Sequence, residues 1–332
     1  MRAIRFHAHG GPEQLRYEEV SDPVCGPDDV VIRIRAAALN GFEPMILGKT
    51  TALRTPLPMI PGGDGCGEIE AVGARVEGWR VGERVGFHPL VPGEGMTGET
   101  RLGTCCERVR VPADRLIRLP EGLGFEQAAA LPVAYGTALR MVTTRGAIRA
   151  GERVLILGAT GGVGTACVQL AKRAGAEVVA CGSAPWKLER LKELGADKVI
   201  DTSREDFREV IWRDYGKPRM QGGGGVEVVI NYIGGDTWVE SLKCLAPGGR
   251  MLVCGATAGY ATPNDARYVW TYELSIVGSN GWTMEDQGRV YAMAAAGELV
   301  PVIDSIRPLA ETAEAVRALV ERRFFGKLVL VP

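Results

Sequence analysis

The residues whose types and spacing most clearly permit chemistry form a glycine-rich run. Val154–Leu157 is apolar, as expected of a strand buried on both faces, and Gly158–Gly164 follows it at once. Thr165–Ala174 then has the pattern of a helix that ends at Gly175. Glycine lets the backbone approach a phosphate closely, and a helix N-terminus directs unpaired N–H groups at the anion. The order of strand, glycine loop and helix therefore predicts a dinucleotide-binding loop.

The segments around this loop alternate between strand and helix patterns. Strands are predicted at 154–157, 178–181, 199–200, 226–230, 251–254 and 274–277, and the helices between them at 165–174, 185–194 and 238–245. Successive strands joined by helical crossovers lie parallel in one sheet. The expected fold class is therefore α/β, with a doubly wound parallel sheet of the Rossmann type.

The first 120 residues have a different pattern. Short strands are predicted at 30–35, 68–72, 84–87 and 106–111, separated by proline and glycine clusters, which is typical of a small β-rich, barrel-like domain. A helix begins at 126–131, is interrupted by Pro132 and resumes at 134–142. The tail contains predicted helices at 286–296 and 311–321 and a strand at 327–331. Periodicity alone leaves open whether this tail extends the parallel sheet or returns to the first domain.

Length and composition exclude several classes of protein. A chain of 332 residues suggests about two domains, and its formal net charge of -1 gives no electrostatic argument for binding nucleic acid or an anionic membrane. No apolar run approaches the roughly 18 residues that span a bilayer, and no secretory signal is visible at the N-terminus. The eight scattered cysteines suit reduced, mostly buried thiols. A cytoplasmic protein is expected.

Several motifs spread over the chain carry a resemblance to a known family. They are the segments 38–43, 61–67 and 129–132 with Thr137–Ala138, the Gly158–Gly164 loop, and the segments 245–250 and 325–330. Together they resemble the medium-chain dehydrogenase/reductase superfamily, and within it the zinc-free, quinone oxidoreductase-like and enoyl reductase-like branch. The resemblance implies a GroES-like catalytic domain at 1–120, a Rossmann NAD(P)-binding domain at 121–279 and a return of 280–332 to the catalytic domain. It also implies a homodimer or homotetramer.

The metal-binding pattern of the zinc alcohol dehydrogenases in this superfamily is interrupted here. Those enzymes begin the first motif with a cysteine, where this chain has Asn40, and carry Gly-His-Glu in the second, where this chain has Gly63–Asp64. Catalytic zinc normally needs three protein ligands, and the three histidines of the chain lie outside both motifs. The prediction is that no metal is bound, although Asp64, Cys66 and His88 meeting in space remains an alternative.

The choice of cofactor depends on the residues after the second strand of the parallel sheet. An NAD-binding unit places a carboxylate about 20 residues beyond the glycine loop, but Ala180–Ser183 contains none. Ser183 offers a hydrogen-bond donor and Lys187 a positive charge, and similar positions serve NADPH in the resembled branch. The predicted cofactor is NADPH. The alternative is that Lys187 is an ordinary solvated helix residue.

The resemblance assigns most of the remaining site residues, and Tyr135 is added because Leu47–Thr50 lacks the tyrosine proton donor that many enoyl reductases of the branch carry there. The predicted catalytic residues are Asn40, Glu43 and Tyr135. Asn40 faces the nicotinamide in relatives or else caps a turn. Glu43 makes a structural hydrogen bond or acts as an acid, and Tyr135 donates a proton or packs on its helix. The predicted cofactor contacts are Thr137, Gly158, Thr160, Gly161, Gly162, Val163, Gly164, Ser183, Lys187, Asn231, Gly255, Ala256, Thr257, Ser279, Asn280 and Lys327.

The expected function is hydride transfer from NADPH, without zinc, to small quinones or α,β-unsaturated carbonyl compounds, including enoyl thioesters. Hydride would reach the β-carbon, hydrogen-bond donors would hold the enolate oxygen, and water or a nearby acid would supply the proton. Two rival interpretations stay open. One is a zinc-containing alcohol dehydrogenase with atypical ligands, and the other is a crystallin-like NADPH-binding protein with low turnover.

Overall fold

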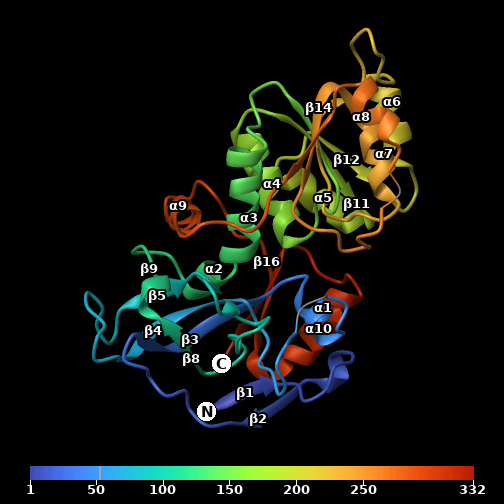
Figure 1. Cartoon of the computed structure of the whole chain (residues 1–332). Coiled ribbons are helices and arrows are strands. Elements are labelled where there is room, and N and C mark those ends of the chain that lie inside the picture. Colours follow the sequence, from blue (N-terminus) through green and yellow to red (C-terminus); the bar gives the residue numbers. More distant parts are fainter. Residues whose placement is uncertain (52–53, 263) are drawn as a thin grey trace. The chain divides into compact units, whose positions relative to one another are not determined.

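The computed structural model describes residues 1–51, 54–262 and 264–332, and the chain divides into two compact units (Figure 1). One unit contains Met1–Ala134 and Thr283–Pro332, and the other contains Tyr135–Trp282. The first division falls after Ala134, whereas the sequence suggested residue 120. The difference arises because α2 (Phe125–Ala129) packs against strands of the first unit. No helix in the described part of the chain is both long and apolar enough to cross a bilayer.

A seven-stranded sheet organises the first unit. Its strands are β3 (Asp29–Leu39), β4 (Asp64–Val72), β5 (Arg84–Phe87), β8 (Arg108–Pro112), β9 (Leu116–Arg118), β16 (Ile303–Pro308) and β17 (Lys327–Val331). They follow the order β16-β17-β3-β4-β5-β9, with β8 also paired to β3. Along β3, buried Ile32 and Ile34 alternate with exposed Arg33 and Arg35, because successive side chains of a strand point to opposite faces. The tail joins this sheet, since β17 pairs antiparallel with β3.

Smaller elements complete the first unit. The other strands pair as β1 (Arg2–Arg5) with β2 (Arg16–Glu19) and β6 (Leu90–Val91) with β7 (Gly95–Met96). The helices are α1 (Glu43–Leu47), α2, α9 (Met284–Ala295) and α10 (Thr312–Val320), with short 3₁₀ turns η1 (Pro12–Gln14), η2 (Ala113–Arg115) and η5 (Leu309–Glu311). Helix α10 buries Ala315, Val316 and Ala318 and packs beside α1, although the two are far apart in the chain (Figure 1).

A six-stranded parallel sheet forms the centre of the second unit. Its strands are β10 (Arg153–Ile156), β11 (Glu177–Gly182), β12 (Lys198–Asp201), β13 (Val226–Ile230), β14 (Leu245–Val253) and β15 (Ser275–Gly278). The helices are α3 (Thr137–Leu139), α4 (Gly162–Arg173), α5 (Pro185–Glu193), α6 (Phe207–Tyr215), α7 (Thr237–Cys244) and α8 (Ala266–Thr271). The strand order β12-β11-β10-β13-β14-β15 is that of a Rossmann sheet, which confirms the predicted α/β class. In such sheets ligands bind beyond the carboxyl ends of the strands, where the order reverses between β10 and β13.

The helix predicted at 134–142 is not a regular α-helix. Two π-helical segments, η3 (Pro132–Gly136) and η4 (Arg140–Arg145), flank the single turn of α3. Pro132 lacks an N–H group, so the regular ladder of backbone bonds is interrupted there. The Thr143 hydroxyl donates to the Leu139 carbonyl at 2.6 Å and so competes with the backbone ladder. Local competition for backbone groups therefore produces the wider helix.

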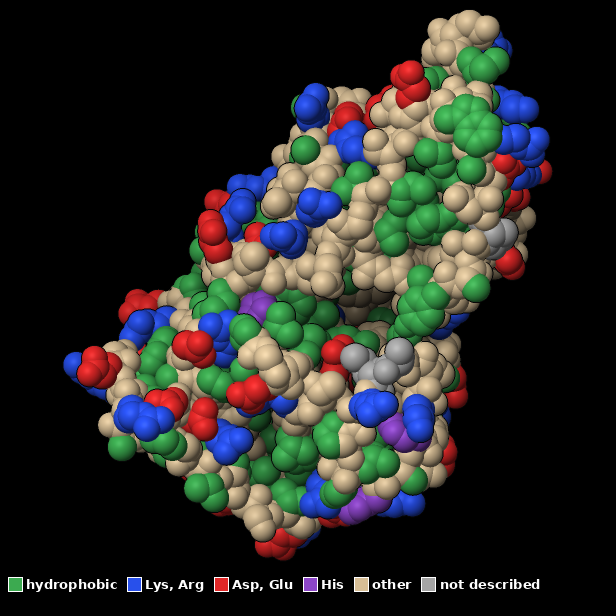
Figure 2. All heavy atoms as spheres, viewed as in Figure 1, with side chains coloured by type: hydrophobic (Ala, Val, Ile, Leu, Met, Phe, Trp, Pro, Cys, Tyr) green, Lys and Arg blue, Asp and Glu red, His purple; other side chains and the backbone are tan. Residues whose placement is uncertain are grey.

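Charged side chains of both signs lie on the surface of the two units. In the face shown in Figure 2, basic and acidic side chains are interspersed over both units. Many of them pair, as Arg153 does with Glu227 and Arg250 with Glu152.

Candidate functional site

The glycine loop lies between β10 and α4, as its pattern predicted. Gly158 has a φ of +67°, a conformation that favours glycine, and lets the chain turn directly after the strand. Gly161 occupies the N-cap of α4 with extended backbone, and no side chain caps the helix. A Cβ placed on Gly161 would have only the Gly158 carbonyl oxygen near it, at 3.8 Å. The N-terminus of α4 therefore has no side-chain cap and has open space beside Gly161, which suits the binding of a pyrophosphate.

Two further residues fix this loop. A Cβ on Gly164 would lie 2.4 Å from the Gly158 oxygen and 2.5 Å from the Ala159 Cα, so only glycine allows α4 to pack this closely. The Tyr232 hydroxyl donates to the Gly158 carbonyl at 2.7 Å and holds the turn from the end of β13. No motif in the sequence predicts this role for Tyr232. Its position two residues beyond a buried strand, at the edge where ligands bind, was the available signal.

Most of the predicted cofactor contacts lie at one edge of the parallel sheet. Ser183 follows β11, Asn231 follows β13, Gly255–Thr257 lies beyond β14 and Ser279–Asn280 follows β15. Because the carboxyl ends of parallel strands meet at one edge, these segments lie on the same side of the sheet as the glycine loop. Of the predicted cofactor contacts, only Lys327 belongs to the other unit.

Asn231 and Ser279 differ in whether their side chains have hydrogen-bonding groups left for a ligand. The Asn231 amide donates to Ser241 at 2.9 Å and to Thr237 at 3.1 Å, and its oxygen accepts from the backbone N–H groups of Ile233 and Gly234. Asn231 therefore shapes the loop after β13. The Ser279 hydroxyl is different, since it is buried and has no hydrogen-bond partner among the described residues. An unpaired buried hydroxyl is costly, so it fits a site completed by a polar ligand.

Ser183 and Lys187 flank the end of β11. Ser183 is exposed, whereas Lys187 is only 5% exposed in the first turn of α5. The Lys187 ammonium lies 5.3 Å from the centre of the Trp186 ring. Burial of Lys187 argues against the alternative of a solvated lysine. Asp201, which pairs with Gly182 in the sheet register, accepts from the N–H and hydroxyl of Ser203.

In the first unit, the sheet register brings together three polar residues from distant segments. Asp64 begins β4 opposite Ala38 of β3, and Leu328 of β17 lies opposite Leu39 of β3. Because both pairings are antiparallel, Asn40, just beyond β3, lies beside Asp64 on one side and Lys327 on the other. This pairing joins three segments that are far apart in the chain, so no local sequence pattern predicts it.

Asn40, Asp64 and Lys327 form a buried hydrogen-bonded cluster. The Lys327 ammonium donates to the Asn40 amide oxygen and, at 3.0 Å, to the Asp64 carboxylate. The Asn40 amide nitrogen donates to the same Asp64 oxygen at 3.0 Å. Their exposed fractions are 7% for Asn40, 0% for Asp64 and 2% for Lys327. The structure therefore groups Lys327 with a predicted catalytic residue, although the sequence analysis placed it among the cofactor contacts.

Glu43 lies at the start of α1 and is hydrogen-bonded to the backbone of Asn40, a member of this cluster. Its carboxylate accepts from the backbone N–H of Asn40 at 2.6 Å and from that of Gly63 at 3.3 Å. Complete burial raises the pKa of Glu43 to about 8, and the nearby Lys327 charge opposes that rise. The two backbone bonds tie the segments that carry Asn40 and Gly63 to each other. This is the structural role that the sequence analysis weighed against acid catalysis.

Comparison with known proteins identifies the family. The chain matches the alcohol dehydrogenase GroES-like domain over residues 26–121 and the zinc-binding dehydrogenase family over residues 162–296. A quinone oxidoreductase of Pseudomonas aeruginosa is 31% identical, over 100% of this chain and 99% of that protein. The chain belongs to the medium-chain dehydrogenase/reductase superfamily.

Other members of the superfamily are similar over the whole chain. A 2-methylene-furan-3-one reductase of Solanum lycopersicum is 32% identical, over 100% of this chain and 79% of its own length. The crystal structure of an NAD-dependent alcohol dehydrogenase has a TM-score of 0.91 and 35% identity, with 100% of both chains covered. As a member of the superfamily, the protein is an oxidoreductase whose family implies a nicotinamide cofactor, and the open helix end and unpaired Ser279 hydroxyl fit that group.

Zinc, which one matched family name mentions, does not fit the equivalent positions in this member of the superfamily. Where zinc relatives carry ligands, this chain has the Asn40 amide, Gly63 with no side chain, and Asp64. A Cβ on Gly63 would lie 2.6 Å from the Phe42 ring, so that ring fills the space of a ligand side chain. The Lys327 ammonium already pairs with Asp64 there. Among the described residues no group of three His, Cys, Asp or Glu side chains could hold a metal ion.

Tyr135, the third predicted catalytic residue of this oxidoreductase, is completely buried in the π-helical segment η3. It belongs to the unit Tyr135–Trp282, whereas Asn40 and Glu43 belong to the other. Thr137, on α3, is also buried. Burial of Tyr135 favours the packing role that was weighed against proton donation.

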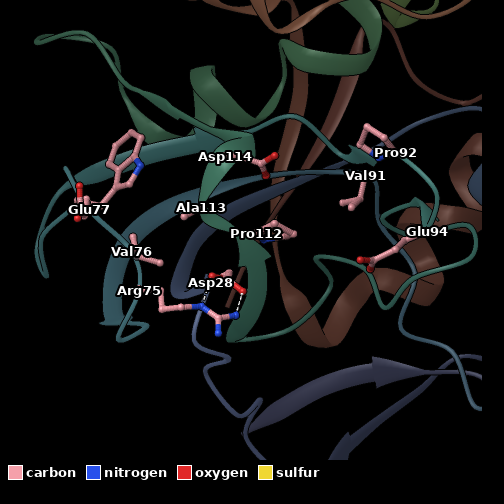
Figure 3. A pocket seen from close by; sticks show the side chains of 11 residues that line it. Asp28, Arg75, Val76, Glu77, Val91, Pro92, Glu94, Pro112, Ala113 and Asp114 are labelled. Atoms are coloured by element: carbon pink, nitrogen blue, oxygen red, sulfur yellow. Dashed lines mark hydrogen bonds and ion pairs between the residues drawn. The ribbon is translucent and has the colours of Figure 1, made fainter.

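An open hollow of about 620 Å³ lies elsewhere in the first unit. Figure 3 shows its lining, with Arg75 directed at Asp28 on one side and Val91 and Pro92 on the other. The Arg75 guanidinium donates to Asp28, and Glu94 pairs with Arg101, so much of its charge is balanced locally. No predicted site residue lines it. We assign it no role.

Proposed function

We propose that the protein is an NADPH-dependent, zinc-independent reductase of quinones or α,β-unsaturated carbonyl compounds. The observation that carries the proposal is the cluster of Asn40, Asp64 and Lys327, where an ammonium group and an amide stand in place of a metal-ligand set. Without a Lewis acid, oxidation of a simple alcohol lacks a group to stabilise the alkoxide. When hydride adds to a conjugated carbonyl compound, the electron pair of the broken π-bond delocalises onto the carbonyl oxygen. Hydrogen-bond donors at that oxygen are enough to stabilise the charge.

The cofactor and the solvent together supply the hydride and the proton that the reduction needs. When bound, NADPH supplies a hydride to the β-carbon of the conjugated system and leaves as NADP⁺. Asn40 donates a hydrogen bond to the substrate oxygen, where the electron pair of the broken π-bond collects as an enolate. Water supplies the proton to the α-carbon. For a quinone, the hydride supplies two electrons and one hydrogen, and one proton from water completes the hydroquinone.

Preference for NADPH over NADH is supported by the end of β11. Lys187 is buried there, one turn from Ser183, and no carboxylate occupies Ala180–Ser183. A carboxylate at this place would accept from the ribose 2′-hydroxyl and would repel a 2′-phosphate. An ammonium and a hydroxyl favour the phosphate.

We also propose a cytoplasmic homodimer or homotetramer with small-molecule substrates. All eight cysteines are free thiols, which suits a reducing compartment. Strand β15 is an edge of the parallel sheet, and its Ile276 is 41% exposed. An apolar edge strand is a template for pairing with a second copy of the chain. Light scattering of the purified protein and of Ile276→Lys tests this, with a smaller mass expected for the variant.

Turnover measurements distinguish the proposal from its rivals. NADPH oxidation is followed with a quinone, a simple enone, crotonyl-CoA and an aldehyde, each with and without a chelator. We expect turnover of at least one of the first three that the chelator does not affect. Turnover of the aldehyde alone, lost with chelator, would establish an alcohol dehydrogenase with an atypical metal site. Tight NADPH binding with no turnover of any substrate would favour the crystallin-like protein.

A further inference from the structure

The orientation of the Asn40 side chain is determined by the chemistry of its two neighbours. An ammonium group only donates hydrogen bonds, so the Asn40 oxygen must face Lys327. A carboxylate only accepts, so the Asn40 nitrogen must face Asp64. An amide beside neutral partners can turn over and exchange its oxygen and nitrogen. Here the opposite charges on its two sides permit one orientation.

Asp64 is itself held in place from several directions. Its second carboxylate oxygen accepts from the Val133 backbone N–H at 2.9 Å, and its backbone carbonyl accepts from the Thr104 hydroxyl at 2.7 Å. Asp64 and Lys327 also begin neighbouring segments of one sheet, each paired to β3. The ion pair is therefore a rigid support and not a pair of mobile side chains.

Within this cluster, one N–H of the Asn40 amide remains available as a hydrogen-bond donor. The amide nitrogen carries two hydrogens, and one is used by Asp64. The other has no partner among the described residues, and Asn40 is the most exposed member of the cluster. Donation from Lys327 to the amide oxygen draws electron density from the nitrogen and strengthens the remaining N–H as a donor. The pair thus aims the donor and also strengthens it.

We propose that Asp64 and Lys327 are positioning residues that act through Asn40 to aim one N–H donor at the carbonyl oxygen of the substrate. The proposal rests on the proposed reductase function. It gives Lys327 a role on the substrate side, whereas the resemblance placed it with the cofactor. A fixed donor of this kind stabilises the oxygen most when it becomes negatively charged, so it raises kcat more than it lowers KM.

The test uses the double variant D64N/K327M, which removes both charges together and leaves no buried ion unpaired. A matched control, K172M/D197N, removes an ion pair of similar length from the surface of the other unit. For each protein we would measure kcat and KM with a quinone and an enone, the Kd of NADPH by fluorescence, and the free energy of unfolding. In D64N/K327M we expect kcat to fall about 100-fold, with KM and the NADPH Kd near the wild-type values. The control should match wild type in kcat, KM and the NADPH Kd.

With an active wild-type protein, two results would overturn the proposal. A folded D64N/K327M protein with wild-type kcat would show that the pair serves the fold alone. If kcat falls only in proportion to the fraction of unfolded protein, the pair again serves the fold alone. If wild-type protein turns over neither substrate class while binding NADPH, the reductase function fails, and this inference fails with it. That case is distinct from active wild type with an equally active double variant, where only the inference fails.

Discussion

The Lys327 ammonium donates to the Asp64 carboxylate at 3.0 Å, although the two residues are 263 positions apart in the chain. Neither side chain is more than 2% exposed. Taking two charges out of water costs free energy that their attraction and further hydrogen bonds must offset, and here Asn40 and the Val133 N–H supply those bonds. The arrangement is therefore sensitive to loss of either partner.

Replacement of Lys327 by methionine should destabilise the protein strongly. Lys327→Met leaves the Asp64 carboxylate buried without a counter-ion, a change that typically costs about 3–5 kcal/mol. Urea unfolding followed by circular dichroism measures the effect. Addition of Asp64→Asn should recover part of the loss, because the remaining buried groups are then neutral. Equal stability of the single variant and wild type would mean that the pair is accessible to water.

Burial of Glu43 should make stability depend on pH. Its pKa is about 8 in the folded protein against an ordinary value of 4.5, so between these values the folded state holds a proton that the unfolded state has lost. The free energy of unfolding should therefore fall as pH rises through this window, by up to about 1.4 kcal/mol per pH unit. Below it the contribution of Glu43 is fully present, and above it that contribution is lost.

Glu43→Gln tests this directly, because glutamine resembles the protonated acid and does not titrate. Urea unfolding at several pH values inside the window should show a flatter dependence for the variant than for wild type. Glu314→Gln, at an exposed position on α10, is the matched control and should keep the wild-type slope. If Glu43→Gln and wild type have the same slope, Glu43 is ionised throughout and the nearby Lys327 charge outweighs burial.

The sequence predicted the parallel sheet and its glycine loop well, because both depend on local patterns. Val154–Leu157, the glycines and the following helix are adjacent in the chain, and strand and helix periodicities differ clearly. The π-helical segments were missed, since their pattern of apolar residues is also compatible with an α-helix. Tyr232 was missed because one tyrosine after a strand has no distinctive spacing.

The cluster around Asn40 could be predicted only in part. Resemblance marked Asn40 and Glu43, but Asp64 was considered only as a metal ligand and Lys327 as a cofactor contact. What joins them is the register of β4 and β17 on β3. Register depends on pairing between segments that are far apart, so no local period encodes it.

Two glycines of the loop should respond differently to alanine. A Cβ on Gly164 would overlap backbone atoms of Gly158 and Ala159, so Gly164→Ala should cost about 1–3 kcal/mol of stability. Gly161 has a φ of −86° and room for a Cβ, so Gly161→Ala should fold normally. The new methyl group would nevertheless lie where a phosphate approaches, and we expect at least about tenfold weaker NADPH binding.

Thermal unfolding and NADPH fluorescence titration, applied to both alanine variants, separate these effects. Each variant is a control for the other, since one should lose stability and the other affinity. Wild-type affinity in Gly161→Ala would place the pyrophosphate away from the α4 N-terminus and would remove the main support for the cofactor site.

The choice between NADPH and NADH should depend on Lys187. Lys187→Gln keeps a polar side chain of similar reach but removes the positive charge that would face a 2′-phosphate. A charge-assisted hydrogen bond contributes about 1.5–3 kcal/mol, so kcat/KM for NADPH should fall roughly tenfold or more, with little change for NADH. Lys192→Gln, at the exposed end of the same helix, is the control and should change neither value. Equal losses with both cofactors would mean that Lys187 supports the fold near β11, and the protein would then have no charge-based preference for NADPH at this position.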